Sequence, residues 1–354
     1  MNNIYISAKV SVIIPTKNRC SLLSETVESI RQQTYANWEI IIVDDDSTDA
    51  TIETMVALSK IEPRVRFFQR TSTQSGAPAC RNEGVVFSTG EYIIFLDSDD
   101  CLASFCLENR IKTMEKHPDL DFGIFPCQLF SKKPGDTDLL WNIDTQSDDL
   151  NRFLSLDAPW GTTSPIWKRQ ALARLGPWDE SILRWQDWDF HVRALILDFN
   201  YKKFAGSPDW FWRMASSDRK TVSSKGYTIE QICSSEQLFS KIYSMLCQTQ
   251  LLDAYRRDLF TKLYFWLAKK WISLGFRKEA MRLWSTYQKK QSSFQGKYYW
   301  EGFLYLQISG LPFIKRIVRK YKLIHRSPRL NVQFSNTFKK APMQNHTYLK
   351  IFND

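Results

Sequence analysis

Short apolar runs alternate with segments of helical spacing over roughly the first 130 residues. Four runs are apolar and rich in β-branched residues, as buried strands are. They are Val10–Ile14, Trp38–Val43, Val65–Gln69 and Tyr92–Leu96. Helical spacing occupies Leu22–Gln32, a segment that begins at Thr48 and continues through Met55 and Leu58, and Pro78–Phe87. This order predicts an α/β fold with a mostly parallel central sheet covered by helices on both faces.

The pattern becomes mixed after Asp121 and then purely helical. We expect strands near Phe122–Phe125, Ser164–Trp167 and Tyr201–Phe204, and helices over Arg169–Leu175 and Asp187–Leu197. Beyond Tyr227, helical spacing continues through the 280s and, less regularly, to Ile324. We therefore expect an α/β domain over residues 1–225, a helical C-terminal region over 226–326 and a polar tail over 327–354.

Two clusters of carboxylates directly follow two of the predicted strands. Asp44-Asp45-Asp46 ends the second strand, and Asp97-Ser98-Asp99-Asp100 ends the fourth. The carboxyl edge of such a sheet is where ligands bind. Neighbouring carboxylates repel one another, so a cation usually accompanies them, and hard oxygen ligands suit Mg²⁺ or Mn²⁺. The alternative for the second cluster is a solvated acidic turn that starts a helix at Leu102.

The familiar nucleotide-binding fingerprints are missing from the sequence. No G-x-G-x-x-G follows the first strand, and no G-x-x-x-x-G-K-[ST] occurs, which argues against dinucleotide oxidoreductases and P-loop NTPases. The first strand is followed instead by Pro15-Thr16-Lys17-Asn18-Arg19. A rigid proline with short polar and cationic side chains can bracket a base and approach a phosphate, but an ordinary strand-ending turn is an equally good interpretation.

Several segments together resemble family 2 of the nucleotide-sugar glycosyltransferases. They are Val10–Asn18, Trp38–Asp49, Ala79–Gly84 and Glu91–Asp100, with the downstream pair Gly176–Glu180 and Trp185–Asp189. The resemblance covers roughly residues 8–215. It implies the GT-A fold, with a Rossmann-like nucleotide-binding half over about 1–130 and an acceptor half over about 131–225.

The resemblance also implies roles for individual residues. Nucleotide binding is assigned to Pro15, Thr16, Asn18, Asp45, Arg81 and Asp97. Asp99 is the principal ligand of Mn²⁺ or Mg²⁺, with Asp97 beside it, and Asp187 is the general base. Two positions depart from the family pattern: Gln186 replaces the usual Glu, and Ala215 stands where members often carry a His near the metal or diphosphate.

Residues around Asp187 are candidates for contact with the acceptor. Trp185 and Trp188 flank it, and aromatic faces stack on sugar rings, although large aromatic side chains more often belong to the core. His191 lies one helical turn after Asp187 on the same face. A lone histidine at such a position is more often a packed helix residue than a ligand. For Asp187 itself, the alternative role is a helix N-cap.

The chemistry of sugar transfer needs these two separate acidic sites. A divalent ion stabilises the charge that develops on the departing diphosphate, and a carboxylate on the opposite face deprotonates the acceptor hydroxyl, so the reaction inverts the sugar carbon. We expect transfer from a nucleoside-diphosphate sugar, with UDP favoured, to a glycan or lipid-linked acceptor in cell-surface polysaccharide biosynthesis. The alternatives are a sugar-phosphate nucleotidyltransferase, which would need a Gly-rich phosphate loop, and a nucleotide-sugar-binding module without turnover.

The net charge of +10 is concentrated late in the chain. Between Tyr255 and Leu330 there are eighteen Lys and Arg against three Asp and Glu. The residues Leu263, Trp266, Leu267, Trp271 and Leu274 fit an amphipathic helix packed on the catalytic domain. The segments Gly302–Leu306, Leu311–Ile314 and Lys315–Lys320 favour contact with an anionic membrane surface. Packing or oligomerisation is the second interpretation of this region, and nucleic acid is the least favoured partner.

The spacing of the cysteines and the hydropathy of the chain indicate the cellular compartment to expect. The seven cysteines form no C-x-x-C pair, and neither a signal peptide nor an apolar run of about eighteen residues is found. We therefore expect reduced thiols and a cytoplasmic protein, with a peripheral position at the inner face of the membrane as a variant of that expectation.

Overall fold

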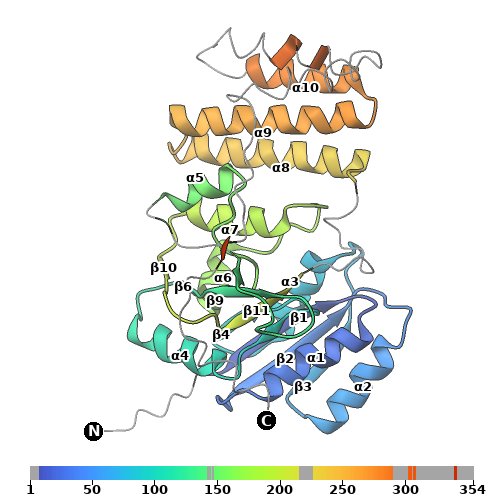
Figure 1. Cartoon of the computed structure of the whole chain (residues 1–354), viewed down its shortest axis with the longest axis vertical. Helices are drawn as coiled ribbons and strands as arrows, with labels where there is room; N and C mark the ends of the chain where they lie inside the picture. The colour runs from blue at the N-terminus through green and yellow to red at the C-terminus, as the bar shows by residue number, and fades with distance from the viewer. Residues whose placement is uncertain are drawn as a thin grey trace.

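The computed structural model describes residues 8–141, 145, 147–214, 226–289, 302–304, 306–307 and 339–340. A central sheet with helices on both faces forms one end of the molecule, and a stack of long helices forms the other (Figure 1). This arrangement confirms the α/β fold with a helical C-terminal region.

The central sheet has seven strands in the order β10-β6-β9-β4-β1-β2-β3. Their bounds, in chain order, are β1 Val10–Thr16, β2 Trp38–Asp44, β3 Val65–Gln69, β4 Tyr92–Phe95, β6 Phe122–Ile124, β9 Pro165–Lys168 and β10 Tyr201–Lys203. Within this sheet β9 runs antiparallel to both of its neighbours, and the other pairs are parallel. The predicted mostly parallel sheet is thus confirmed.

The first strand is longer than predicted. Pro15 lies within β1, opposite Val43 of β2, and the pairing continues to Thr16 opposite Asp44. On the other side, β4 pairs with β1 only as far as Ile13. A proline without an N–H is tolerated here because the ladder on its donor side has already ended.

Alternate residues of β1 contribute to two cores, because successive side chains of a strand point to opposite faces. Ile13 belongs to one cluster of buried residues, while Val12 and Ile14 belong to the other. The helices on the Val12 face are α1 Cys20–Arg31, α2 Thr51–Ile61 and α4 Cys106–Lys116. Those on the Ile13 face include α3 Ala77–Phe87, α6 Arg169–Leu175 and α7 Gln186–Ile196.

A second, five-stranded sheet in the order β12-β8-β7-β11-β5 was not expected from the sequence. Its strands are β5 Cys101–Leu102, β7 Cys127–Phe130, β8 Leu139–Leu140, β11 Trp210–Arg213 and β12 Lys339–Lys340. Strands of two to four residues carry too little periodicity to be recognised. The acidic turn after β4 therefore leads into β5, and the alternative of a helix starting at Leu102 is wrong.

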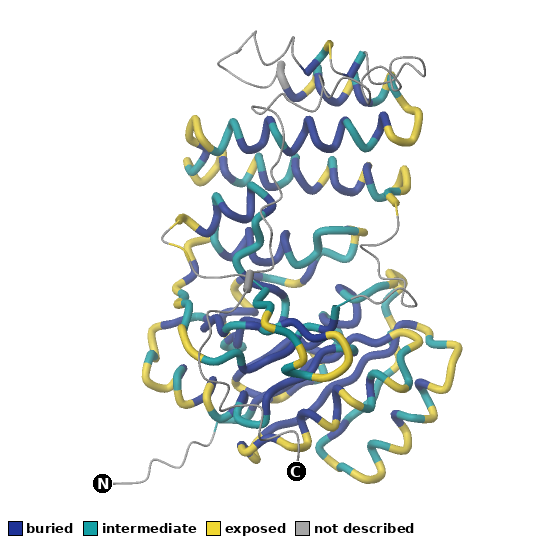
Figure 2. The backbone as a smooth tube through the Cα atoms, viewed as in Figure 1, coloured by how far each residue is buried: buried dark blue, intermediate teal, exposed yellow. Residues whose placement is uncertain are grey.

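Three long helices stack beyond α7 in Figure 1: α8 Ile229–Gln248, α9 Ala254–Ser273 and α10 Arg277–Lys289. The short helix α5 Asp149–Leu154 also packs on α9. Helix α9 is sandwiched between its neighbours, and most of its length is buried in Figure 2. Its residues share one hydrophobic cluster with Ile13 and Phe95 of the central sheet.

The predicted apolar face of this region is largely confirmed. Leu263, Trp266, Leu267 and Trp271 are buried, whereas Leu274, which follows the end of α9, is 38% exposed.

The membrane prediction rests on three segments. In Gly302–Leu306, Leu306 is fully buried and Phe303 packs on the same hydrophobic cluster, so these two side chains face the helical stack and not a membrane. The segments 311–314 and 315–320 lie outside the described residues. No helix in the described ranges combines the length and apolar character needed to cross a membrane.

All seven cysteines are free thiols. Cys80, Cys101, Cys106 and Cys127 are buried, and Cys233 and Cys247 are exposed. Burial raises the pKa of the Cys80 and Cys101 thiols to about 12, so these groups act as small apolar side chains.

Candidate active site

Three loops with polar residues meet at one edge of the central sheet. Strands β4, β1 and β2 are neighbours and parallel, so their carboxyl ends lie side by side. Asn18 lies in the loop after β1, Asp45 in the loop after β2 and Asp97 in the loop after β4. The topology therefore brings together the two acidic clusters that the sequence places 53 residues apart, counted from Asp44 to Asp97.

Asp45 is a buried carboxylate held by three donors. Its Oδ1 accepts from Arg70 Nε at 2.7 Å and from the backbone N–H of Gly76 at 2.9 Å, and its Oδ2 lies 3.1 Å from Lys17 Nζ. Burial acts to raise the pKa of Asp45, but these hydrogen bonds and charges outweigh it and lower the pKa. Asp45 is therefore ionised and fixed in one orientation at neutral pH.

Asn18 ties the first loop to the second. Its backbone N–H donates to Ser47 Oγ at 2.8 Å, and its Oδ1 accepts from the Thr48 N–H at 2.7 Å. Asn18 has a φ of 52°, a left-handed conformation that asparagine tolerates better than most residues. Pro15 and Thr16 are buried at the end of β1, beneath this loop. The backbone N–H of Asp45 donates to the Thr16 carbonyl at 2.8 Å. Pro15, Thr16, Asn18 and Asp45 thus lie together, and we call these four residues the nucleotide wall.

Arg81 reaches from α3 to the end of β4. Its Nη2 donates to Asp97 Oδ1 at 2.7 Å, and its guanidinium lies 4.5 Å over the ring of Trp178. Arg81 is 4% exposed, whereas the Asp97 side chain is 39% exposed. The ion pair therefore holds Asp97 at the surface of the site with one face still open to solvent.

Asp187 lies in the first turn of α7 and shares this environment. Burial raises its pKa, with Arg81 acting to lower it and Asp97 acting to raise it further. Arg81 and α7 also share a neighbour: the Trp178 ring under the Arg81 guanidinium stacks on the ring of Phe190 in α7, with the two centroids 4.0 Å apart. The N-cap of α7 is Trp185 rather than Asp187, so the capping alternative for Asp187 is wrong.

Asp100 has a structural position within the second acidic cluster. It is 1% exposed, and its Oδ1 accepts from the backbone N–H of Arg213 in β11 at 2.9 Å. Burial, together with Asp99 and Asp97, raises its pKa well above the ordinary range. Arg213 also donates from Nε to the backbone carbonyl of Asp99 at 2.8 Å, which fixes the loop. The side chains of Asp97 and Asp99 remain partly exposed.

Comparison with known proteins identifies the residues around this site. The family described as glycosyl transferase family 2 matches residues 11–168. This segment of the chain is therefore similar to glycosyl transferase family 2. The match includes the three loops and Arg81, and it ends before α7.

Curated relatives of the family 2 segment include three bacterial proteins. An uncharacterized glycosyltransferase of Haemophilus influenzae is 28% identical over 52% of this chain and 62% of its own length. A GalNAc(5)-diNAcBac-PP-undecaprenol beta-1,3-glucosyltransferase of Campylobacter jejuni is 38% identical over 29% of this chain and 34% of its own. A poly(ribitol-phosphate) beta-glucosyltransferase of Bacillus spizizenii is 34% identical over 37% of this chain and 23% of its own length. The chain thus spans less than two thirds of each of these relatives.

Solved structures extend the fold comparison beyond the family 2 segment. TarS 1–349 of S. aureus in complex with UDP-GlcNAc has a TM-score of 0.56 at 16% identity, covering 92% of this chain and 88% of that chain. The same protein in complex with UDP gives a TM-score of 0.55. This similarity shows that the chain has the GT-A fold.

Asp97 and Asp99 suit a divalent cation whose remaining coordination positions are filled by the oxygens of a substrate diphosphate. Among the described residues, no group of three or more His, Cys, Asp and Glu side chains is arranged around a metal position. Asp97 and Asp99 are partly exposed oxygen donors on alternate residues of one loop. Mg²⁺ and Mn²⁺ need few protein carboxylates when substrate phosphates supply the remaining oxygens. The donor set therefore suits a cation that arrives with a diphosphate.

The predicted acceptor-side residues differ in where they lie. Trp188 is 3% exposed and donates from Nε1 to the Phe153 carbonyl at 2.7 Å, so it belongs to the core. His191 is 1% exposed among aromatic rings, and burial lowers its pKa to about 3. Trp185 is partly buried and donates to the Tyr227 hydroxyl at 3.1 Å. These placements favour packing over acceptor contact for Trp188 and His191.

Sequence reasoning missed three contributors to the site: Lys17, Arg70 and Trp178. Arg70 directly follows β3, and this position at the carboxyl edge could have indicated it. Trp178 and Lys17 stood inside motifs already quoted, but nothing in the sequence reveals the stacking on Arg81 or the contact with Asp45. Two positions depart from the family pattern, as noted for the sequence. Gln186 donates to the Ile182 carbonyl at 3.0 Å, and Ala215 lies outside the described residues.

Proposed function

We propose that this protein is an inverting glycosyltransferase that moves a sugar from a nucleoside-diphosphate donor to a hydroxyl group of a glycan or lipid-linked acceptor. The observation that carries the proposal is the packing around Trp178, which lies under Arg81 and stacks on Phe190 of α7 at 4.0 Å. With the Arg81–Asp97 ion pair, it joins the edge of the nucleotide-binding sheet to the helix that contains Asp187. Similarity to family 2 and the GT-A fold support the reaction class.

The donor nucleotide is assigned to the wall formed by the first two loops. Asp45, held ionised, offers its remaining acceptor capacity to the N–H groups of a base, beside Pro15, Thr16 and Asn18. Uracil carries such an N–H, and the TarS structures that share the fold contain UDP and UDP-GlcNAc. These points favour a UDP-sugar.

Arg81 and the acidic loop are assigned to the diphosphate. Asp99 and Asp97 would hold a Mn²⁺ or Mg²⁺ ion, which when bound would act as a Lewis acid toward the departing diphosphate. Arg81 offers a buried positive charge at the same place and orients Asp97. In the low-dielectric surroundings of α3 and Trp178, that charge stabilises a phosphate more strongly than an exposed lysine would.

Asp187 is assigned the role of general base. Its raised pKa makes it a better proton acceptor than a solvated aspartate, and its partial exposure allows a hydroxyl group to approach. Attack by that hydroxyl from the face opposite the diphosphate gives a single displacement with inversion. The acceptor names of the Campylobacter and Bacillus relatives favour a lipid-linked or polyol-phosphate acceptor.

The decisive experiment measures release of UDP from a panel of UDP-sugars, with candidate acceptors and with Mn²⁺ or EDTA. The wild-type protein should release UDP in a metal-dependent manner, and product analysis should show an inverted anomeric centre. Asp187→Asn should bind UDP normally but transfer about 10²–10⁴-fold more slowly. Asp119→Asn is the matched control, since this exposed carboxylate precedes β6 at the opposite edge of the sheet.

The outcomes separate the proposal from its rivals. Normal UDP binding without turnover for any donor and acceptor would favour a nucleotide-sugar-binding module. Release of pyrophosphate from a nucleoside triphosphate and a sugar phosphate would favour a nucleotidyltransferase. Full transfer by Asp187→Asn would remove this residue as the base.

Contact of the C-terminal region with an anionic membrane remains a prediction from its charge. Pelleting of the full chain with vesicles of anionic and of neutral phospholipid tests it. Equal pelleting with both lipids, or with neither, would contradict the prediction.

A further inference from the structure

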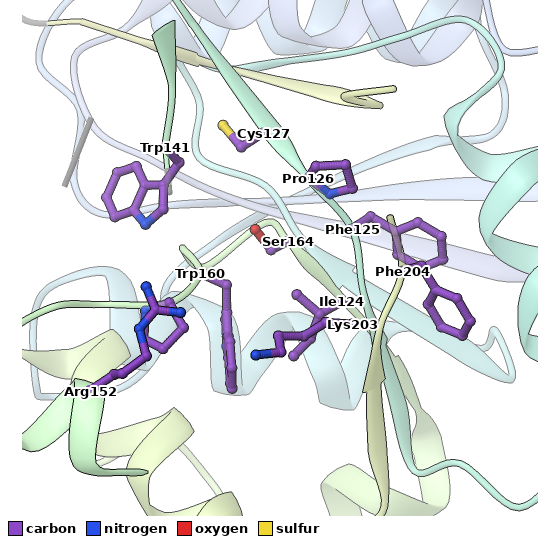
Figure 3. Close-up of a pocket in the computed structure, with 11 residues that line it drawn as sticks. Ile124, Phe125, Pro126, Cys127, Trp141, Arg152, Trp160, Ser164, Lys203 and Phe204 are labelled. Atoms are coloured by element: carbon purple, nitrogen blue, oxygen red, sulfur yellow. The ribbon is translucent and has the colours of Figure 1, made fainter. Parts of the chain in front are cut away.

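A pocket opens at the same edge of the sheet, beside the site described above (Figure 3). It encloses about 420 Å³ of empty space, part of which is open to solvent. Its walls come from the ends of β6 and β10 and from the segment before β9. In the order of the strands, β9 separates β6 from β4, so the pocket lies on the side of the acidic loop that is away from the nucleotide wall.

The pocket shares a wall with the helix of the proposed base. Trp160 lines the pocket, and its ring meets the His191 ring edge-on at 5.7 Å. His191 lies one turn after Asp187 on α7. A ligand held in the pocket would therefore lie on the acceptor side of α7.

The polar side chains that line the pocket are hydrogen-bond donors. Figure 3 shows the indole of Trp160 standing between the guanidinium of Arg152 and the ammonium of Lys203. Ser164 adds a hydroxyl group, and no carboxylate belongs to the described lining. The carboxylates that balance these cations lie behind them: Arg152 Nε donates to Asp157 at 3.0 Å, and Lys203 Nζ donates to Asp149 at 2.8 Å.

Two of the donors are buried without a hydrogen-bond partner among the described residues. Arg152 is 5% exposed, and its Nη1 has no hydrogen bond, with Asp149 Oδ1 3.8 Å away. The Nε1 of Trp160, a residue 2% exposed, is also without a partner. Buried donors are almost always satisfied, and a charged one left unsatisfied is costly. A group with several acceptor oxygens would satisfy Arg152 Nη1.

We propose that this pocket binds the phosphate or carboxylate of an anionic saccharide or polyol unit of the acceptor. The cations select the anionic group, and Trp160 and Trp141 offer aromatic faces to the carbon skeleton that bears it. The identity of the ligand as an acceptor unit rests on the proposed function, whereas its anionic chemistry rests on the pocket alone.

Calorimetry with glycerol 3-phosphate tests the proposal, in the presence of saturating UDP and Mn²⁺ so that the diphosphate site is filled. The wild-type protein should bind this probe and should not bind glycerol. Lys203→Gln and Arg152→Lys should each weaken binding by about tenfold or more, the worth of one charge-assisted hydrogen bond. Lys132→Gln is the matched control, because Lys132 is exposed in the turn after β7, and it should bind as wild type.

Inorganic phosphate and glucuronate distinguish the possible sources of the anion. Both glycerol 3-phosphate and glucuronate should bind more tightly than inorganic phosphate, because they also contact the aromatic wall. Equal affinity for inorganic phosphate would overturn the saccharide assignment. Wild-type affinity in both folded variants, or no binding by the wild-type protein, would overturn the pocket as an anion site. Circular dichroism and thermal melting establish folding, and Lys203→Gln keeps the test open if Arg152→Lys is unstable.

The proposed function and the pocket can fail separately. Binding of UDP without binding of glycerol 3-phosphate would dismiss the pocket alone. Absence of UDP binding would count against the proposed function, and a titration of the probe without UDP would still test the pocket.

Discussion

Arg81 donates a hydrogen bond to Asp97 over 2.7 Å, from a helix to the end of a neighbouring strand. The pair lies at the junction between the nucleotide wall and α7, because Trp178 contacts both the Arg81 guanidinium and the Phe190 ring of α7. One buried cation therefore neutralises the acidic loop and limits the pKa of Asp187, and in the proposed function it also contacts the diphosphate. The following predictions test this arrangement and the packing that supports it.

Arg81→Gln should weaken both UDP binding and transfer. The substitution removes a charge-assisted contact to Asp97 and a buried positive charge, so a loss of about 10- to 100-fold in kcat/KM is expected. Calorimetry and a UDP-release assay measure the two effects. Arg174→Gln serves as the control, because Arg174 is exposed on α6 and pairs with Asp121. Unchanged kcat/KM in Arg81→Gln would contradict the role at the diphosphate.

Removal of the divalent cation should weaken UDP binding by about tenfold or more, which corresponds to about 1.4 kcal/mol. Asp99→Asn should lose most of this metal dependence, and Asp97→Asn part of it, since Asp97 also holds Arg81. Titrations of UDP with Mn²⁺ and with EDTA check both, with Asp119→Asn as the control. Equal metal dependence in Asp99→Asn and wild type would exclude Asp99 as a ligand.

The rate of transfer should rise with pH as Asp187 loses its proton, with an inflection above the ordinary pKa of aspartate because burial raises it. Arg81→Gln should move the inflection higher, since Arg81 lowers this pKa. A pH profile of kcat/KM between about pH 4 and 8 measures both. A profile without an inflection in wild type, or one that moves lower in Arg81→Gln, would contradict the assignment.

The raised pKa of Asp187 also affects how the stability of the fold depends on pH. A pKa raised by folding means that the neutral form of Asp187 is favoured in the folded state, so its contribution is present at low pH and lost as pH rises through the folded pKa. Asp187→Asn should therefore be as stable as wild type, or more stable, at pH 7 in urea unfolding. A large loss of stability would point to a structural role.

Gly84→Ala should destabilise the fold by about 1–3 kcal/mol, the usual cost of overpacking. A Cβ at Gly84 in α3 would clash with Cγ2 of Ile13 in β1, where helix and strand pack closely. Gly84→Ala combined with Ile13→Ala should cost less than the sum of their separate effects, because the shorter side chain removes the clash. Gly226→Ala is the control, because a Cβ there meets no atom within 4 Å. Equal unfolding midpoints for both glycine variants would contradict this contact.

Lys241→Met should loosen the packing of α8 on α7. Lys241 Nζ lies 2.8 Å from Asp179 and 2.9 Å from Asp189, and Asp189 is 1% exposed. Losing this cation should cost about 1–2 kcal/mol, reduced by the partial exposure of Lys241. Lys262→Met, which breaks an ion pair within α9, should cost less than about 0.5 kcal/mol. Equal losses in urea unfolding would argue against coupling of the two helices.

The sequence by itself determined the strands of the central sheet and the acidic loops that follow β2 and β4. Long apolar strands such as β1 and β2 carry a strong local signal, and residues after parallel strands must share one edge. The two acidic clusters could be placed at the site for this reason, and the resemblance to family 2 singled out Asp45, Asp97 and Asp99 within them. The length of β1 was underestimated because proline has no N–H to donate and usually ends a strand. Only the pairing shows that no donor is needed at Pro15, since β4 pairs with β1 no further than Ile13.

Only the tertiary structure decided which residues the candidate side chains meet. Arg81, Trp178 and Asp187 come from separate segments, and no local pattern encodes that a ring stacks on a guanidinium or that two charges act on one carboxyl group. The same holds for Trp160 and Lys203, which line one pocket from distant parts of the chain. Sequence periodicity records which face of an element is buried, whereas contacts between elements depend on how the whole chain packs.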